Sequence, residues 1–350
     1  MNRSRILLAA IAGAIALTGC GERENSEATG STDAGVVNLY TARHYDSDLL
    51  LYERFTEQTG IRVNRIEGNA DQLLARMQAE GASSPADVFV TADAGALWRV
   101  QNAGLFQPAN SEALNAAIPA NLRDPEGRWF GFSRRARIVA YDPARVQPTE
   151  VDTYEEIASP RFRGQLCVRS ADSVYNLSLV GALIEAWGPE RARQWVEGVV
   201  ANMARPPEGG DRDQIRAVGA GVCQIALTNS YYYIRLASGD DAADREITTR
   251  VRLAFPSLDG QGAHVNISGG GVVANAPNRA NAVRLLEYLA SPEAQSLVSQ
   301  HNNEYPASPN VPAPAPVDAY ADFLAHPMPV SAYGPRQAEA LAMMSAAGWR

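Results

Sequence analysis

From residue 36 onward, hydrophobic positions along the chain follow two different periods. Short apolar runs of strand length alternate with stretches in which apolar side chains recur every three or four positions. In residues 48–57, for example, Leu49, Tyr52 and Phe55 fall on one side of a predicted helix, which Gly60 ends. This region predicts strands at 36–40, 61–66 and 86–91, alternating with helices at 48–57, 70–80 and 94–102. Such alternation is typical of an α/β fold with a largely parallel sheet.

The rest of the chain continues the pattern. We predict strands at 130–141, 165–169, 222–228, 251–255 and 263–274, and helices at 174–187, 190–202, 211–220, 231–237, 279–290 and 292–300. Residues 312–316, PAPAP, form an extended linker to a pair of C-terminal helices. Because 350 residues are too many for one core of modest size, we expect two α/β domains.

The N-terminus predicts export from the cytoplasm. Arg3 and Arg5 precede an apolar run, 6–17, that is too short to span a bilayer. The run ends in LTGC, which resembles the lipobox of bacterial lipoproteins, in which the cysteine is acylated. We therefore predict a lipoprotein signal peptide at 1–19, lipidation of Cys20 and a flexible polar tether at 20–35. The alternative is an ordinary secretory signal with a chance cysteine. The expected location is periplasmic, with a lipid anchor on a membrane surface.

Charge and cysteine content narrow the partners and the chemistry. The chain has 39 acidic and 31 basic residues, and this acidic balance argues against a nucleic-acid partner. Cys167 and Cys223 each lie eight residues before a tyrosine, Tyr175 and Tyr231. If their strands are parallel neighbours, the equal offsets would bring the two sulfur atoms together in a compartment that permits disulfides. Two buried free thiols are the alternative.

Three predicted strands are each followed by a tyrosine at the start of a helix. In TNSYYYIRL (228–236), Asn229 or Ser230 would cap a helix whose first residues include Tyr231 and Tyr232. Neighbouring side chains there are about 100° apart, so two rings can converge beyond the strand end, where open α/β sheets bind ligands. The same order places His44 and Tyr45 after strand 36–40, and Tyr175 after strand 165–169.

Several phenols together favour one kind of cation. Phenolate is a hard, anionic donor, but a free phenol has a pKa near 10, so only a strong Lewis acid would deprotonate several at neutral pH. Ferric ion meets this requirement, whereas zinc prefers cysteine and histidine and calcium prefers carboxylates. Taken singly, any of these tyrosines could be a half-buried aromatic with its hydroxyl in water.

The chain resembles the periplasmic ferric-ion-binding proteins of ABC importers, in the tyrosine-rich subgroup, through most of its length after the tether. The resemblance lies in YTARHYDSD (40–48), SPADVFVTADAGALWRVQNAGLF (84–106), RRARIVAYD (134–142), SVYNLSLVGA (173–182), TNSYYYIRL, LEYLASPEAQ (286–295) and NNEYP (302–306). It implies that His44, Tyr45, Tyr175, Tyr231 and Tyr232 bind Fe³⁺ as the transported ligand, and that Tyr233 packs in the core. A related subgroup has a glutamate ligand after a strand like ADVFVT. This chain has Ala92 and Asp93 there, which puts a carboxylate ligand in doubt.

The charge of such a site requires a nearby cation. Four phenolates around Fe³⁺ leave one negative charge, which a buried site would not hold uncompensated. Arg43, Arg135 and Arg137 are the candidates for this role. For any one of them, the alternative is a solvated surface arginine.

The resemblance also implies an architecture and a function. We expect a two-lobed periplasmic-binding-protein fold with hinge strands, one lobe formed by 36–136 and 265–310 and the other by 137–264, with 311–350 packed on the body. The lobes would close on the ion by a hinge, and an ABC permease would recognise the closed monomer. One alternative is an oxyanion or small organic solute held by arginines and backbone amides. The other is a secreted hydrolase, but the sequence has no G-x-S-x-G, H-E-x-x-H or P-loop motif, and we expect no enzyme activity.

Overall fold

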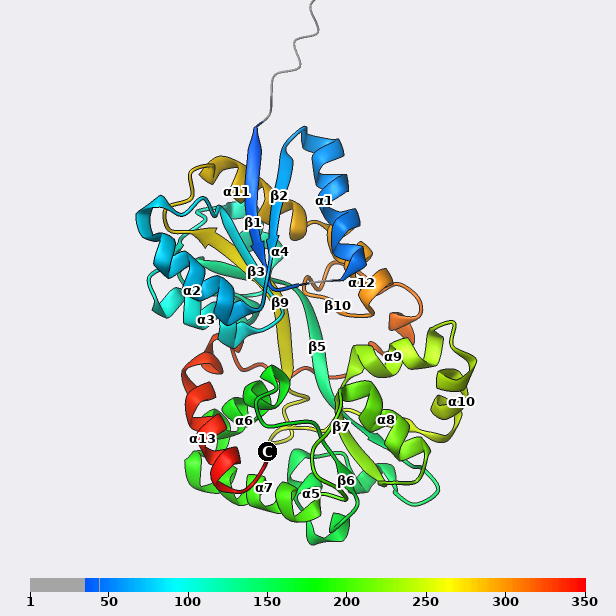
Figure 1. Ribbon diagram of the computed structural model, residues 1–350. Coiled ribbons are helices and arrows are strands. Elements are labelled where there is room, and N and C mark those ends of the chain that lie inside the picture. Colours follow the sequence, from blue (N-terminus) through cyan, green and yellow to red (C-terminus); the bar gives the residue numbers. More distant parts are fainter. Residues whose placement is uncertain (1–34, 44) are drawn as a thin grey trace, which may run out of the picture. The chain divides into compact units, whose positions relative to one another are not determined.

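A computed structural model describes residues 35–43 and 45–350 (Figure 1). The predicted signal peptide, Cys20 and residues 20–34 of the tether lie outside the described residues. So does His44, one of the five predicted ligands. In the part of the chain that is described, no helix is both long and apolar enough to cross a bilayer.

The described strands form one mixed sheet. Its order is β2 (Arg62–Glu67), β1 (Val36–Thr41), β3 (Val88–Thr91), β9 (Val265–Val273), β5 (Trp129–Tyr141), β7 (Ile225–Asn229) and β6 (Leu166–Cys167). The short strands β4 (Phe106–Gln107), β8 (Arg252–Ala254) and β10 (Tyr305–Pro306) pair beside β9 or β5. β1 is parallel to β2 and β3, and β6 to β7, but β5 and β9 run antiparallel to every strand they pair with. The prediction of a largely parallel sheet was therefore wrong, because β5 and β9 are buried on both faces, as parallel strands are, and lack the alternation of buried and exposed residues that indicates antiparallel pairing.

Two long strands, β5 and β9, connect the two halves of this sheet and lie side by side in Figure 1. β5 pairs with β9 as far as Ala136, opposite Val265, and from Arg137 onward it pairs with β7. We call the elements around β1–β3 lobe 1 and those around β6–β8 lobe 2. β5 changes partners between Ala136 and Arg137. The predicted lobe boundaries stay a prediction.

Helices cover both lobes. Lobe 1 carries α1 (Asp46–Thr59), α2 (Ala70–Glu80), α3 (Ala94–Asn102), α4 (Glu112–Ala117), α11 (Arg279–Leu289) and α12 (Pro292–Asn302), with 3₁₀ turns η1 (Gly81–Ser83) and η2 (Ala120–Leu122). Lobe 2 carries α5 (Tyr154–Ile157), α6 (Val174–Trp187), α7 (Pro189–Asn202), α8 (Asp211–Gly219), α9 (Ser230–Ser238) and α10 (Ala242–Arg250), with η3 (Pro148–Glu150) and η4 (Pro160–Phe162). Apart from α10, which has no buried residue, these helices bury apolar side chains, as Phe55 in α1 and Leu179 in α6 illustrate.

The C-terminal segment differs from its prediction. Instead of a helical pair, it forms the turns η5 (Val317–Tyr320), η6 (Val330–Ala332) and η7 (Gly334–Arg336), followed by one helix, α13 (Gln337–Ala346). Pro327, Pro329 and Pro335 explain the difference, since proline lacks the N–H of a helical hydrogen bond and restricts the residue before it. The segment packs against α3 of lobe 1 and α6 of lobe 2.

A disulfide joins Cys167 and Cys223. The strands β6 and β7 are parallel neighbours, which was the condition for bringing the two sulfurs together. The register is not the one assumed, because Cys167 lies opposite Ala226, and Cys223 precedes β7. The bond therefore fixes the start of β7, the strand that leads into the tyrosine run.

We expect the disulfide to contribute substantially to stability. Its two cysteines are 56 residues apart, and closing a loop of that length restricts the unfolded chain by about 4 kcal/mol. Urea denaturation of the protein with and without reductant should therefore differ by roughly this free energy of unfolding. The variant with both cysteines replaced by serine should match the reduced protein; equal stability of all three forms would contradict the prediction.

Candidate metal centre

Three tyrosine hydroxyls converge in lobe 2. Tyr175 lies in the first turn of α6, and Tyr231 and Tyr232 lie in the first turn of α9. The Tyr175 hydroxyl is 2.9 Å from that of Tyr231 and 3.4 Å from that of Tyr232, and the rings of Tyr231 and Tyr232 are 4.1 Å apart. The predicted strand-to-helix junctions account for this: α9 starts directly after β7, α6 starts after a short turn beyond β6, and both direct their first side chains to the same point. Asn229 and Ser173 occupy the N-cap positions without a side-chain cap bond.

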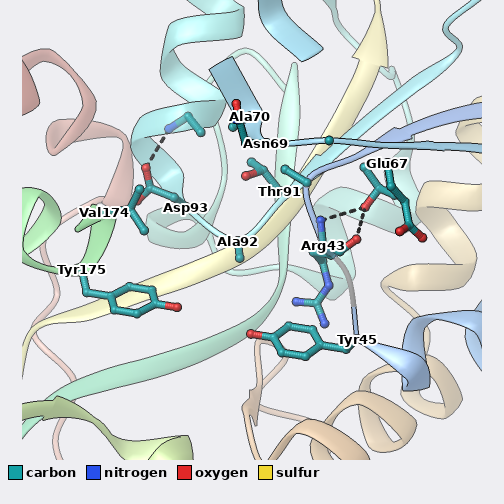
Figure 2. Close-up of a pocket in the computed structure, with 14 residues that line it drawn as sticks. Arg43, Tyr45, Glu67, Asn69, Ala70, Thr91, Ala92, Asp93, Val174 and Tyr175 are labelled. Atoms are coloured by element: carbon teal, nitrogen blue, oxygen red, sulfur yellow. Dashed lines mark hydrogen bonds between the residues drawn. The ribbon is translucent and has the colours of Figure 1, made fainter. Parts of the chain in front are cut away.

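A fourth tyrosine approaches from lobe 1. Tyr45 follows β1 and is itself the N-cap residue of α1, one position before the Asp46 or Ser47 expected in this role. Figure 2 shows Tyr45 and Tyr175 directed toward each other hydroxyl-first. Four of the five predicted ligands therefore meet at one place. The prediction that Tyr233 packs in the core is confirmed, since it is buried and donates to the carbonyl of Val251 at 2.9 Å.

A buried polar network holds the lobe 2 tyrosines in place. Arg137, on β5, donates to Asp211 at 2.6 Å, to Asn176 at 2.8 Å and to Asn229 at 3.2 Å. Asp211 also accepts the backbone N–H of Asn229 at 2.8 Å. Asn176 follows Tyr175 and Asn229 lies two residues before Tyr231, so the network fixes both tyrosine-bearing helix starts relative to the crossing strand.

The three predicted arginines are all buried beside the tyrosines, but they differ in their partners. Arg43 is paired with Asp48 at 2.9 Å and Arg137 with Asp211 at 2.6 Å. Arg135 donates to the carbonyl of Ala92, and its Nη1 has no hydrogen-bond partner among the described residues. Its guanidinium lies 5.7 Å from the centre of the Tyr175 ring. Of these three arginines, Arg135 is therefore the one with no carboxylate at ion-pair distance among the described residues.

The environment keeps three of the phenols protonated in the free protein. Burial is the largest cause that raises the pKa of Tyr45, Tyr175 and Tyr231 above that of a free phenol. For Tyr175 and Tyr231 the neighbouring tyrosines raise the pKa further, while Arg135 opposes the shift. For Tyr45 the charge of Glu304 adds to the effect of burial. A ligand of these oxygens must therefore displace protons.

A cavity of about 490 Å³ opens beside Tyr45 and Tyr175 (Figure 2). The backbone ends of β1 and β3 and the starts of α2 and α3 line it. Asp93 is among its lining residues, but its carboxylate accepts from the backbone N–H of Ala96 and the side chains of Asn266 and Gln337. These structural hydrogen bonds agree with the doubt about a carboxylate ligand there.

The donor set suits a hard, highly charged cation. Among residues 35–43 and 45–350, no cluster of three or more histidine, cysteine, aspartate and glutamate side chains could hold a metal. The converging donors are phenols, and phenolates favour a strongly Lewis-acidic ion such as Fe³⁺ over zinc or calcium.

Some residues near the tyrosines were missed by the sequence analysis. Arg235 lies one helical turn after Tyr231 on α9, and its guanidinium is 5.9 Å from the ring centre of Tyr45, on the opposite lobe. It also donates to the carbonyl of Asn302 in lobe 1 at 3.5 Å. Because Arg235 lies four residues after Tyr231, the sequence could have placed both side chains on the same side of the predicted helix. Asp211 and Glu304 gave no such signal, because their partners are distant in sequence.

Comparison with known proteins gives three kinds of match. The model of the family described as bacterial extracellular solute-binding proteins matches residues 83–325. Iron uptake protein A2 of Synechocystis sp. is 46% identical over 91% of this chain and 92% of its own length, and iron uptake protein A1 is 43% identical over 97% and 95%. The solved structure of Trichodesmium IdiA (FutA) in complex with iron and citrate ligands has 50% identity and a TM-score of 0.86, covering 90% of this chain and all of that one.

Proposed function

The chain belongs to the family of bacterial extracellular solute-binding proteins, and we propose that it captures ferric iron between its two lobes and delivers it to an ABC permease. The observation that carries this proposal is the meeting of four tyrosine hydroxyls, three from lobe 2 and one from lobe 1. We propose Tyr45, Tyr175, Tyr231 and Tyr232, together with His44, as the ligands. The similarity to iron uptake proteins over almost the whole chain supports the choice of iron.

Capture would join the two lobes. Tyr45, which His44 precedes in the sequence, is attached to lobe 1 and Tyr175, Tyr231 and Tyr232 to lobe 2, so one ion bound by all of these ligands would hold the lobes together across β5 and β9. We propose that the permease recognises this closed form. Release would follow protonation of the phenolates or reduction to Fe²⁺, which carries less charge and binds phenolate less strongly.

The site also needs charge compensation. Ferric ion with four phenolates carries one negative charge, and we propose that Arg135 supplies the compensating positive charge. Its buried position beside Tyr175 supports this role, as does the lack of any described carboxylate at ion-pair distance from it, although the charge of Glu304 acts on it from farther away. Arg43 has two carboxylate partners, Asp48 and Glu304, and Arg137 shares the single carboxylate of Asp211 with Arg169.

The location completes the proposal. The relatives include a protein named as periplasmic and Fe(3+)-binding, which agrees with function outside the cytoplasm. We propose in addition that Cys20 is acylated after removal of residues 1–19 and that the protein acts as a monomer on a membrane surface. Incorporation of radiolabelled palmitate, lost in Cys20→Ala, would test the anchor.

Two other functions were open from the sequence. The relatives are uptake proteins, so a secreted hydrolase is set aside. An oxyanion or small organic solute is less favoured, because the relatives that match almost the whole chain are named as iron uptake proteins. We therefore keep ferric iron as the proposed ligand.

Colour distinguishes the functions directly. Adding ferric citrate to the protein without residues 1–19 should produce a visible absorption band from phenolate-to-iron charge transfer, saturating at one ion per chain. An oxyanion-binding protein or a metal-free hydrolase would stay colourless. A colourless protein at saturating iron would end the ferric proposal.

Ferric affinity is expected to rise steeply with pH. Because burial raises the pKa of Tyr45, Tyr175 and Tyr231, these phenols hold their protons at neutral pH and release them when they bind the ion. Binding is therefore favoured as pH rises and lost as pH falls. With four tyrosines bound, the logarithm of the association constant should increase by about 4 per pH unit. Citrate competition, corrected for the protonation of citrate, measures this slope, and a slope near zero would contradict phenolate ligation.

A further inference from the structure

Glu304 is a buried carboxylate that joins the two crossing strands. It lies immediately before β10 and is 1% exposed. Its Oε2 accepts hydrogen bonds from the hydroxyl of Ser133 on β5 and, at 3.0 Å, from that of Ser268 on β9. These two serines face each other in the β5–β9 pairing. Glu304 therefore hydrogen-bonds to both crossing strands at one paired position, where Ser133 lies opposite Ser268.

The other oxygen of Glu304 leads to the Tyr45 loop. Its Oε1 is 3.5 Å from Nη1 of Arg43. The Nη2 atom of the same guanidinium pairs with Asp48 at 2.9 Å. The Arg43 guanidinium lies 5.1 Å from the centre of the Tyr45 ring. The contacts thus run from the crossing strands through Glu304 and Arg43 to the tyrosine of lobe 1.

Hydrogen bonding alone does not require a charge at this position. A glutamine in place of Glu304 can direct its amide oxygen to Nη1 of Arg43 and donate its two amide N–H groups to the serine hydroxyl oxygens, and Arg43 keeps its two-point contact with Asp48. The carboxylate nevertheless stays ionised: burial alone would raise the pKa of Glu304, but Arg43, Arg135 and the two serine hydroxyls outweigh burial and lower it. A negative charge therefore lies next to Arg43, the arginine whose guanidinium is 5.1 Å from the centre of the Tyr45 ring.

This charge opposes iron binding by the proposed ligands. When one ferric ion replaces four phenolic protons, the site becomes more negative by one charge. A fixed carboxylate nearby makes that change less favourable, more so in a buried environment where charges are poorly screened. The buried charge also offsets part of the positive charge of Arg43 and Arg135.

We propose that Glu304 is a positioning residue with two opposed effects on the iron site. It anchors the Tyr45 loop to the crossing strands, and its charge holds ferric affinity below the level that the tyrosines would otherwise reach, which favours release to the permease. The inference rests on the proposed function, because it assumes ferric iron bound by four phenolates.

Two substitutions separate the effects. Glu304→Gln keeps the hydrogen bonds and removes the charge, so ferric affinity in citrate competition should increase by about tenfold. The midpoint potential of the bound iron should become more positive, since the reduced site carries one more negative charge and gains more from losing the carboxylate. Glu304→Leu removes the anchoring as well, and its ferric affinity should fall below that of the unmodified protein.

Glu80→Gln is the matched control. Glu80 also accepts from two hydroxyls, those of Tyr40 and Ser84, and from Arg76. It lies at the end of α2, and none of these partners is a proposed iron ligand. Its substitution should leave ferric affinity and potential unchanged. An affinity of Glu304→Gln that is unchanged or lower would overturn the charge effect, and an affinity of Glu304→Leu equal to that of Glu304→Gln would overturn the anchoring. A colourless unmodified protein would instead reject the ferric function itself, so the two failures are distinguishable.

Discussion

Replacing Tyr231 by phenylalanine is expected to lower ferric affinity by more than about a hundredfold, the upper end of the loss for changing a residue that only supports a ligand. The substitution removes one phenolate oxygen and leaves the ring in its buried position. The charge-transfer band should weaken and shift, because fewer phenolates donate to the ion. Tyr175→Phe and Tyr232→Phe should behave alike, since the hydroxyls of Tyr231 and Tyr232 both lie within 3.4 Å of that of Tyr175.

Tyr233→Phe is the matched control, because it removes a hydroxyl from the same helix. The Tyr233 hydroxyl donates to Val251 in the core, so its loss should lower stability modestly and leave colour and affinity unchanged. Equal affinity in Tyr231→Phe and Tyr233→Phe would show that the predicted pair does not bind the ion. Circular dichroism of each variant confirms that a loss of colour is not a loss of fold.

Replacing Arg135 by methionine is expected to lower ferric affinity by about ten- to a hundredfold while the visible band remains. The ligands stay in place, but the net negative charge of the loaded site is no longer compensated. Arg137→Met should act differently, lowering stability by about 3–5 kcal/mol, because it removes the 2.6 Å partner of the buried Asp211 and leaves only the weaker pair with Arg169 at 3.5 Å.

The contrast between these two arginines tests the proposed assignment. Citrate competition gives the affinities, and urea denaturation of the iron-free proteins gives the stabilities. A large loss of stability in Arg135→Met with unchanged affinity would assign it a structural role. Unchanged affinity after replacing each of Arg43, Arg135 and Arg137 would refute compensation by any of them.

The sequence predicted the tyrosine positions well because the relevant geometry is local. A strand end, a short turn and a helix start are adjacent in sequence, so the residues of each junction indicate where Tyr175 and Tyr231 point. Convergence of different junctions then follows from the general arrangement of α/β sheets. Tyr45 was placed in the same way, although the start of α1 differs by one residue from the expected cap.

The network behind the tyrosines could not be predicted because its contacts are distant in sequence. Arg137 meets Asp211 across 74 positions, and Arg43 meets Glu304 across 261. No local pattern distinguishes these acids from those on the surface. For the same reason, the three candidate arginines could not be ranked until the carboxylate partners of two of them were known.

The predictions of strand direction and of the C-terminal segment were wrong for different reasons. The strands β5 and β9 are buried on both faces, so their side chains do not alternate between buried and exposed positions. The sequence pattern therefore did not show that they run antiparallel to their neighbours. The C-terminal prolines were present in the sequence, and greater weight on them would have replaced the helical pair by turns before α13.

The most direct test of the central claim is a crystal structure of the iron-loaded protein, with anomalous diffraction measured at the iron absorption edge. The proposal predicts one strong anomalous peak within coordination distance of the hydroxyl oxygens of Tyr45, Tyr175, Tyr231 and Tyr232 and of the imidazole of His44. A peak bound elsewhere, or one that lacks the lobe 1 ligands in a closed molecule, would contradict it.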